Sequence, residues 1–222
     1  SWYLSAYWGQ VDSIWGFFVL LSVYALLKEK TFLAVFFAGI SILFKQTAVL
    51  FFPLILFYSF KKKKFAAIFS ALAVLLFLTY SAYLPFLPNN TLASAVNLYL
   101  KSFRGEIDYL VANAFNLWAL FFGFEPKPVN VLFFGIPAVW AGYFLFILTG
   151  LLIFKKLWGS LTKVNFLIVI FLFSYAVFLF LPRMHERYFY LSYLFLPTLM
   201  MINKRRMVCY VIISTIFLLN LY

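Results

Sequence analysis

The apolar stretch VNFLIVIFLFSYAVFLFL, residues 164–181, is followed directly by Pro182 and then by RMHERY, residues 183–188. The first stretch suits a single membrane-spanning helix, because a hydrocarbon core of about 30 Å needs about 20 mostly apolar residues. The second stretch places four ionisable side chains, including the only histidine, within residues 183–187. Charged side chains at the end of such a helix generally face protein or water, so this cluster is a candidate functional site.

The composition indicates a polytopic membrane protein. Hydrophobic residues make up 66% of the chain, aromatic residues 24% and charged residues only 11%, and a soluble domain could not bury so much apolar surface. The net charge is +12, but the basic residues form short clusters between apolar runs, which is typical of cytoplasmic anchoring and excludes nucleic acid as a partner. The single cysteine, Cys209, excludes a disulfide framework and a thiolate metal site.

The apolar runs predict an all-α membrane fold with about eight transmembrane helices, some of them short or re-entrant. No soluble domain, repeat or linker interrupts them, so residues 1–222 are predicted to form a single transmembrane domain. Because the chain begins without methionine and stops inside an apolar run, we expect it to be a fragment that is truncated at both ends. The predicted spans are a first helix that ends near Leu27, a hairpin over 31–60 interrupted at Lys45, residues 65–86, 132–154, 164–181 and 189–202, and a last run from Met207.

The basic clusters also predict the sidedness of the polar residues. With those clusters in the cytoplasm, the remaining polar residues fall on the opposite face: Asp12, Lys45, Gln46, residues 104–108, and Arg183 to Arg187. Each arm of the 31–60 hairpin has about 14 residues and reaches about 21 Å, which is short of the hydrocarbon core. The Lys45-Gln46 tip should therefore lie in a recessed polar cavity that opens to the outside.

Residues 183–188 suggest a phosphate site. Arg183 and Arg187 would share one face if the preceding helix continued through them, and two guanidinium groups can clamp a phosphate while His185 adds a donor. The alternative is that the arginines extend to lipid headgroups. Interleaved His185 and Glu186, on the side where positive charge is sparse, favour the phosphate site.

Three further residues carry two interpretations each. Lys45 either extends to the headgroups or contacts a ligand phosphate. Asp12 either caps the helix that follows or faces the cavity as a carboxylate able to accept a proton. Asn116, with Asn113 and Trp118 nearby, either binds sugar or is an ordinary interfacial residue.

Three segments in this order resemble the GT-C superfamily of glycosyltransferases: YWGQVDS at 7–13, LFKQT at 43–47 with Pro53 behind it, and RMHERY at 183–188. NAFNLW at 113–118 is similar to a segment of the mannosyltransferase-like group. The closest group is the bacterial membrane proteins related to GPI mannosyltransferase II. The dolichyl-phosphate-glucose glucosyltransferases come next.

The resemblance implies transfer of a hexosyl group, such as mannosyl, from a polyprenyl or dolichyl phosphate, with inversion at the anomeric carbon. It implies an active site on the outer face of the bacterial cytoplasmic (inner) membrane and a glycan, lipid or protein acceptor. The catalytic residues would be Asp12, His185 and Glu186, and the substrate-binding residues Gln10, Lys45, Gln46, Asn116, Arg183, Arg187 and Tyr188. Some relatives use a divalent metal, but the sequence assigns no metal ligands.

One departure concerns the catalytic base. The superfamily usually places its acidic residue in the first outer loop, which would lie before Ser1, whereas Asp12 lies at the entrance to the following helix. The main alternative function is a secondary transporter or lipid flippase, which would also use broken helices around a charged cavity. A transporter should have polar residues along a path from one side of the membrane to the other. The polar residues of this chain are predicted to gather on one face of the membrane instead. A purely structural subunit would leave the charges at 183–187 unexplained.

Overall fold

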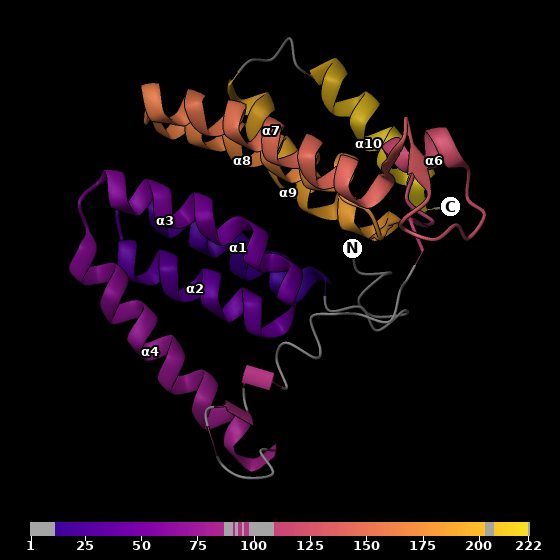
Figure 1. Cartoon of the computed structure of the whole chain (residues 1–222). Helices are drawn as coiled ribbons and strands as arrows, with labels where there is room; N and C mark the ends of the chain where they lie inside the picture. Colours follow the sequence, from indigo (N-terminus) through magenta and orange to yellow (C-terminus); the bar gives the residue numbers. More distant parts are fainter. Residues whose placement is uncertain are drawn as a thin grey trace. The chain divides into compact units, whose positions relative to one another are not determined.

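The computed structural model describes residues 12–86, 91, 93–94, 96–97, 109–202 and 207–221. The chain forms two compact units, Ser1–Glu106 and Ile107–Tyr222, and both are mainly helical (Figure 1). Three sets of residues with predicted roles lie outside the described residues: Gln10, residues 104–108 and the basic cluster at 203–206. Their predicted roles stay predictions. The single-domain prediction therefore stays a prediction, and each unit is described by itself.

Within the described residues, three helices are long and apolar enough to cross a membrane. They are Phe65–Phe86, Ala138–Gly159 and Lys163–Phe180. Shorter apolar helices cover Asp12–Leu27, Thr31–Phe44 and Gln46–Lys61. These lengths and compositions support membrane association and a mainly helical fold, whereas the count of about eight spans stays a prediction.

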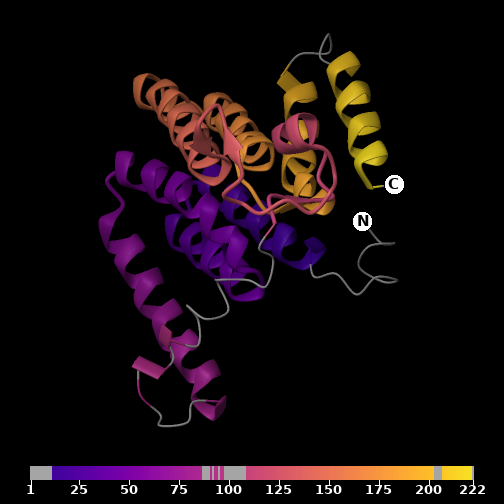
Figure 2. The same cartoon turned by 45° about the vertical axis from the view of Figure 1, so that its right-hand side comes forward.

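The first unit is a group of packed helices. Its elements are α1 (Asp12–Leu27), α2 (Thr31–Phe44), the 3-10 helix η2 (Gln46–Phe51), α3 (Phe52–Lys61), α4 (Phe65–Tyr83) and the 3-10 turn η3 (Leu84–Phe86). Helix α2 packs against both α1 and α4, and α1, α2 and α3 lie side by side in Figures 1 and 2. The predicted end of the first helix at Leu27 and the predicted interruption at Lys45 are both confirmed.

Small side chains let α2 approach its neighbours closely. A Cβ atom on Gly39 would lie 2.2 Å from Cδ1 of Leu75 in α4, so a larger residue at this contact would displace the Leu75 side chain. On the side toward α1, the hydroxyl of Ser41 in α2 donates to the carbonyl oxygen of Trp15 in α1 at 2.9 Å. In the other direction, the hydroxyl of Ser22 in α1 donates to the carbonyl oxygen of Ala34 in α2 at 2.7 Å. Serine hydroxyls thus tie α1 to α2 inside an otherwise apolar interface.

Two basic turns of the first unit have the same geometry. Glu29 after α1 and Lys63 after α3 adopt left-handed backbone conformations, with φ of 61° and 56°. The N–H of Lys30 donates to the carbonyl of Ala25, and the N–H of Lys64 to that of Ser59, which is the hydrogen bond of a Schellman motif. Both helices therefore end in the same way, immediately before α2 and α4.

The second unit contains two membrane-length helices, further helices and four short strands. Its elements are β1 (Val111–Ala112), α6 (Leu117–Phe122), β2 (Leu132–Phe133), β3 (Ile136–Pro137), α7 (Ala138–Gly159), α8 (Lys163–Phe180), β4 (Met184–His185), the 3-10 helix η4 (Glu186–Phe189), α9 (Tyr190–Ile202) and α10 (Met207–Leu221). Helix α8 packs between α7 and α9, and α10 packs on α9 (Figures 1 and 2). The predicted spans at 164–181 and 189–202 agree with α8 and α9 within one residue at each end.

The predicted span at 132–154 is wrong at both ends. Residues 132–137 form the hairpin of β2 and β3, whose antiparallel register pairs Phe133 with Ile136. Gly135 has φ of 83°, a conformation that favours glycine and permits the tight turn. Helix α7 then begins at Ala138 and continues past the two lysines at 155 and 156 to Gly159. Apart from such two-residue strands, the described residues are mostly helical, in agreement with the predicted all-α class.

The loops of the second unit have their own apolar core. Leu110, Val111, Trp118 and Ala138 are buried together, and the ring of Trp118 meets that of Phe133 edge to face at 5.4 Å. This core joins the segment before α6 to the beginning of α7. It gives α6 and the hairpin fixed places beside the end of α8.

Candidate functional site

Residues 181–189 leave the helical conformation as soon as α8 ends. Leu181 is extended, with φ of −71° and ψ of 140°, as expected for a residue before proline. Arg183 then adopts a left-handed backbone conformation with φ of 63°, after which Met184 and His185 form β4. The prediction that Arg183 and Arg187 share a helical face is wrong, because Pro182 stops α8 before either arginine.

Strand pairing holds this segment in place. Strand β4 pairs in parallel with β1, with Val111 opposite Met184 and Ala112 opposite His185. The N–H of Arg183 donates to the carbonyl of Leu110 at 2.9 Å. The strained backbone at Arg183 is therefore held by its own hydrogen bond and by the strand pairing that begins at Met184. Such fixed, strained residues are common where a binding site needs one defined conformation.

Two side chains from the segment around α6 cap the end of α8. The last carbonyl groups of a helix have no partner within the helix. The indole nitrogen of Trp118 donates to the carbonyl of Phe180 at 2.8 Å. The side-chain amide of Asn116 donates to the carbonyls of Phe178 and Leu181, at 3.3 and 3.5 Å. Sequence reasoning missed this capping role, for which Pro182 just beyond the helix was the available signal.

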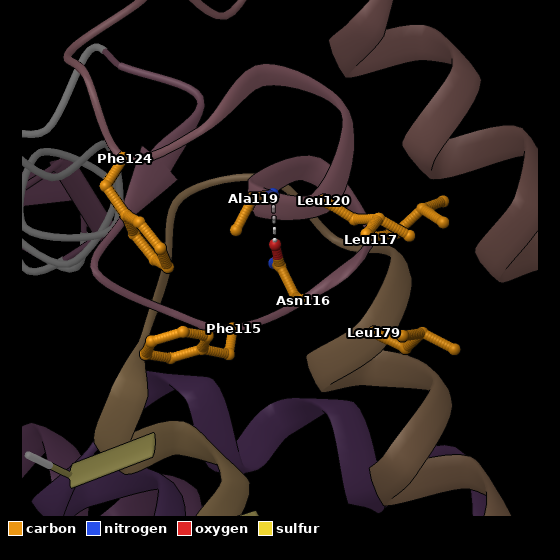
Figure 3. Close-up of a pocket in the computed structure, with 7 residues that line it drawn as sticks. All are labelled: Phe115, Asn116, Leu117, Ala119, Leu120, Phe124 and Leu179. Carbon is orange, nitrogen blue, oxygen red and sulfur yellow. Dashed lines mark hydrogen bonds between the residues drawn. The ribbon is translucent and has the colours of Figure 1, made fainter. Parts of the chain in front are cut away.

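Asn116 has a structural role that argues against the predicted sugar contact. Its side-chain oxygen accepts from the N–H groups of Trp118 and Ala119, so it is also the N-cap of α6 (Figure 3). Together with the two bonds to α8, these contacts use both donors and both acceptors of the amide. The residue is buried, and no polar group of its side chain is left for a substrate.

An apolar pocket of about 470 Å³ opens beside Asn116. Figure 3 shows the rings of Phe115 and Phe124 on one side and Leu120 and Leu179 on another. The two rings meet edge to face at 4.6 Å. The walls offer hydrocarbon contacts rather than the hydrogen bonds that a sugar needs.

Four side chains of the motif, those of residues 185–188, lie in contact with a neighbour in the motif. Nδ1 of His185 lies 3.8 Å from Oε2 of Glu186, close enough for an ion pair when the imidazole is protonated. The His185 ring meets the ring of Tyr188 edge to face at 5.4 Å, and the guanidinium of Arg187 lies 5.8 Å from the centre of that ring. All four side chains are partly exposed. The motif thus combines orienting contacts with access for a ligand.

The first unit contains a second polar centre, around Asp12. Lys45 forms an ion pair with the carboxylate of Asp12, and the indole nitrogen of Trp15 donates to the same carboxylate oxygen at 2.8 Å. The Lys45 ammonium also lies 5.6 Å from the centre of the Trp15 ring. The side chains of Lys45 and Asp12 are only 16% and 4% exposed. Sequence analysis selected both charges but did not predict that they pair.

The ion pair changes the interpretation of both residues. Lys45 is extended at the break between α2 and η2, and Gln46 begins η2. Asp12 is the first residue of α1, where a carboxylate interacts favourably with the helix dipole. Its contacts with Lys45 and Trp15 add a third role to the two predicted ones, which were the helix cap and the carboxylate that accepts a proton in the cavity. Trp15 was missed by sequence reasoning, although its spacing of three residues from Asp12 places the two on one helical face.

The described residues contain no group of three or more His, Cys, Asp or Glu side chains that could hold a metal ion. A divalent metal therefore stays a prediction without assigned ligands. Comparison with known proteins found no matching family model, curated protein or solved structure. The functional assignment rests on the motifs of the chain and on the geometry of each unit.

Proposed function

We propose that this chain is part of an integral-membrane glycosyltransferase of the GT-C type. It transfers a hexosyl group, such as mannosyl, from a polyprenyl or dolichyl phosphate to a glycan, lipid or protein hydroxyl. The reaction takes place on the outer face of a bacterial cytoplasmic membrane and inverts the anomeric carbon. The observation that carries the proposal is the cationic segment from Arg183 to Arg187, held out of helical conformation at the end of a membrane-length helix.

The cations suit the leaving group of this reaction. When the bond between the anomeric carbon and the phosphate oxygen breaks, its electron pair stays on the lipid phosphate, and nearby cations stabilise the added charge. Arg183 and Arg187 supply guanidinium groups that bind phosphate oxygens through two hydrogen bonds each. His185 adds a donor, and the carboxylate of Glu186 lies beside it, with Oε2 3.8 Å from Nδ1 of His185.

The acceptor hydroxyl forms the new bond to the anomeric carbon and gives up its proton to a carboxylate. Asp12 is the candidate base of the first unit, held by Lys45 and Trp15. Lys45 and Gln46, at the break after α2, are proposed to contact the substrate, as are Gln10 and Tyr188. Asn116 is left out of the site because its hydrogen bonds hold the backbone.

The test is transfer of radiolabelled sugar from a polyprenyl-phosphate-sugar by the full-length protein in liposomes. Arg187→Ala should abolish transfer while the protein remains folded. Lys163→Ala is the matched control, since Lys163 begins α8 at the end opposite the motif and is exposed. Full transfer by Arg187→Ala would remove that residue from the site. Substrate movement across the liposome membrane without any transfer would instead establish a transporter.

A further inference from the structure

We propose that the hairpin of β2 and β3 inserts its apolar tip among the acyl chains of the bilayer that α7 crosses. The hairpin covers residues 132–137 and ends directly at the first residue of α7. Its partner is the hydrocarbon of phospholipids at the edge of the membrane core. This inference is independent of the glycosyltransferase proposal and depends only on α7 crossing a membrane.

The length of α7 places the hairpin near the boundary of the apolar layer. The helix begins at Ala138, and its first charged residue is Lys155. The uncharged part spans about 25 Å at 1.5 Å per residue, close to the hydrocarbon thickness of about 30 Å. Lysine side chains extend to the headgroups at their own end. Ala138, at the other end of the helix, therefore lies close to the opposite boundary of the core, and the hairpin lies next to it.

The exposed apolar surface of α7 continues onto the hairpin. Trp140, Phe144 and Leu148 are exposed and lie at intervals of four residues, so they share one face of α7. Ile136, in β3 just before the helix, is exposed as well. Leu132 and Phe134 extend the exposed apolar surface to the hairpin tip. A surface of this kind on a membrane-length helix is the one that lipid covers.

Phe134 itself supports a contact beyond the chain. It is 86% exposed and has φ of 48°, a conformation that asparagine or glycine adopts at lower energy in a hairpin turn. A phenylalanine at this position neither relaxes the turn nor fills the core of the unit. Insertion into hydrocarbon would give its ring a favourable environment.

Only part of the hairpin backbone is hydrogen-bonded within the chain. Pairing of β2 with β3 places Phe133 opposite Ile136 and Leu132 opposite Pro137, and Pro137 has no N–H to donate. Because unsatisfied backbone groups are costly at membrane depth, the insertion is confined to the side chains of the tip at the edge of the hydrocarbon core. The N–H of Ala138 donates to the carbonyl of Val131 at 2.8 Å, and the N–H of Val139 to that of Val129 at 3.1 Å. The loop therefore occupies the first two N–H donors of α7.

A groove of about 410 Å³ lies between the hairpin and the first turns of α7. Phe133, Phe134, Ile136, Trp140 and Phe144 are among its walls, which are formed by apolar residues only. No hydrogen-bonding side chain other than the indole of Trp140 is present to fix a polar ligand. A phospholipid acyl chain is the occupant that matches such walls and this place beside a membrane helix.

The proposal is tested by spin-label accessibility in liposomes of phosphatidylglycerol and phosphatidylethanolamine. Phe134→Cys is made in a Cys209→Ser background and labelled with a nitroxide, and its collision rates with oxygen and with a water-soluble nickel complex are compared. Trp140→Cys is the lipid-exposed reference. Glu125→Cys, in the exposed loop that precedes the hairpin, is the water-exposed reference.

The expected oxygen-to-nickel ratio at Phe134 lies closer to that of Trp140 than to that of Glu125. A ratio closer to that of Glu125 would overturn the proposal, because it would place the hairpin tip in water. If Phe134→Cys fails to fold, the label is moved to Ile136, which is exposed in β3. The oxygen-to-nickel ratio at Ile136 is then compared with those at Trp140 and Glu125, and the same two outcomes support or overturn the proposal.

Discussion

The indole nitrogen of Trp118 donates a 2.8 Å hydrogen bond to the carbonyl oxygen of Phe180, the last residue of α8. Trp118 is fully buried, so this bond joins the core of the second unit to the point at which α8 ends. Asn116 adds two bonds to the same helix end. The charged segment that follows Pro182 therefore begins from a fixed position, and the residues around α6 act on the candidate site by positioning it.

Asn116→Asp separates the two structural roles of this side chain. The aspartate can still accept from the N–H groups that begin α6, but it cannot donate to the carbonyls of Phe178 and Leu181. We expect the free energy of unfolding to fall by about 1–3 kcal/mol, because buried polar groups lose their partners. Denaturant titration in detergent measures the change. The exposed Asn130, substituted in the same way, should show little effect, and equal losses at both positions would contradict the capping role.

Gly142→Ala tests how closely α7 approaches the end of α8. A Cβ atom at this position would lie 2.6 Å from the carbonyl oxygen of Phe180 and 2.9 Å from Cζ2 of Trp118. Since a backbone oxygen cannot move aside cheaply, we expect the free energy of unfolding to fall by about 1–3 kcal/mol.

Gly150→Ala is the matched control in the same helix. Its Cβ atom would lie 3.8 Å from Cε2 of Phe173, an ordinary contact. Replacing this helical glycine should raise the free energy of unfolding by about 0.5–1 kcal/mol, since alanine favours helix. A Gly142→Ala variant as stable as Gly150→Ala would show that α7 does not pack on Phe180 as described.

Much of the helical fold could be predicted from the chain, because helix ends carry local signals. The apolar run that stops at Leu181 predicted the end of α8 within one residue, and the break at Lys45 followed from a polar triplet within an apolar run. The beginning of α7 was mispredicted because Leu132 and Phe133 continue the apolar run without a charge. Apolar residues of a short hairpin and of a membrane helix look alike when only hydropathy is considered.

The geometry of the candidate site could not be predicted in the same way. The conformation of Arg183 depends on pairing between β1 and β4, which lie far apart in the chain. The ion pair between Asp12 and Lys45 likewise joins separate helices. Residue types identified these side chains as unusual for a membrane protein, but their partners are set by tertiary packing, which no spacing in the sequence encodes.

The ion pair of Asp12 and Lys45 should stabilise the first unit through mutual neutralisation. Removing one partner of a buried pair leaves an unpaired charge, so Asp12→Asn and Lys45→Met should each lower the free energy of unfolding by about 3–5 kcal/mol. The double variant should lose much less than the sum of the single losses. Additive losses would mean that the two charges do not interact.

The exposed pair of Lys62 and Glu29, at 3.3 Å, is the control for this cycle. Both side chains are exposed to a large extent, and solvent-exposed ion pairs contribute about 0.2–1 kcal/mol. Lys62→Met and Glu29→Gln should therefore change the free energy of unfolding little. The contrast between the two pairs measures the effect of burial on the same kind of contact.

Substitutions of Arg183 separate its backbone conformation from its charge. Arg183→Ala removes the guanidinium and keeps a Cβ atom in the left-handed conformation, whereas Arg183→Gly removes the guanidinium and relieves that strain. If the proposed phosphate contact is correct, neither variant transfers sugar. We expect Arg183→Gly to be more stable than Arg183→Ala by about 1 kcal/mol. Transfer assays and denaturant titration of both variants measure the two effects. Transfer at the wild-type rate by Arg183→Gly would show that the residue serves the turn alone, and equal stability would show that the left-handed conformation carries no strain.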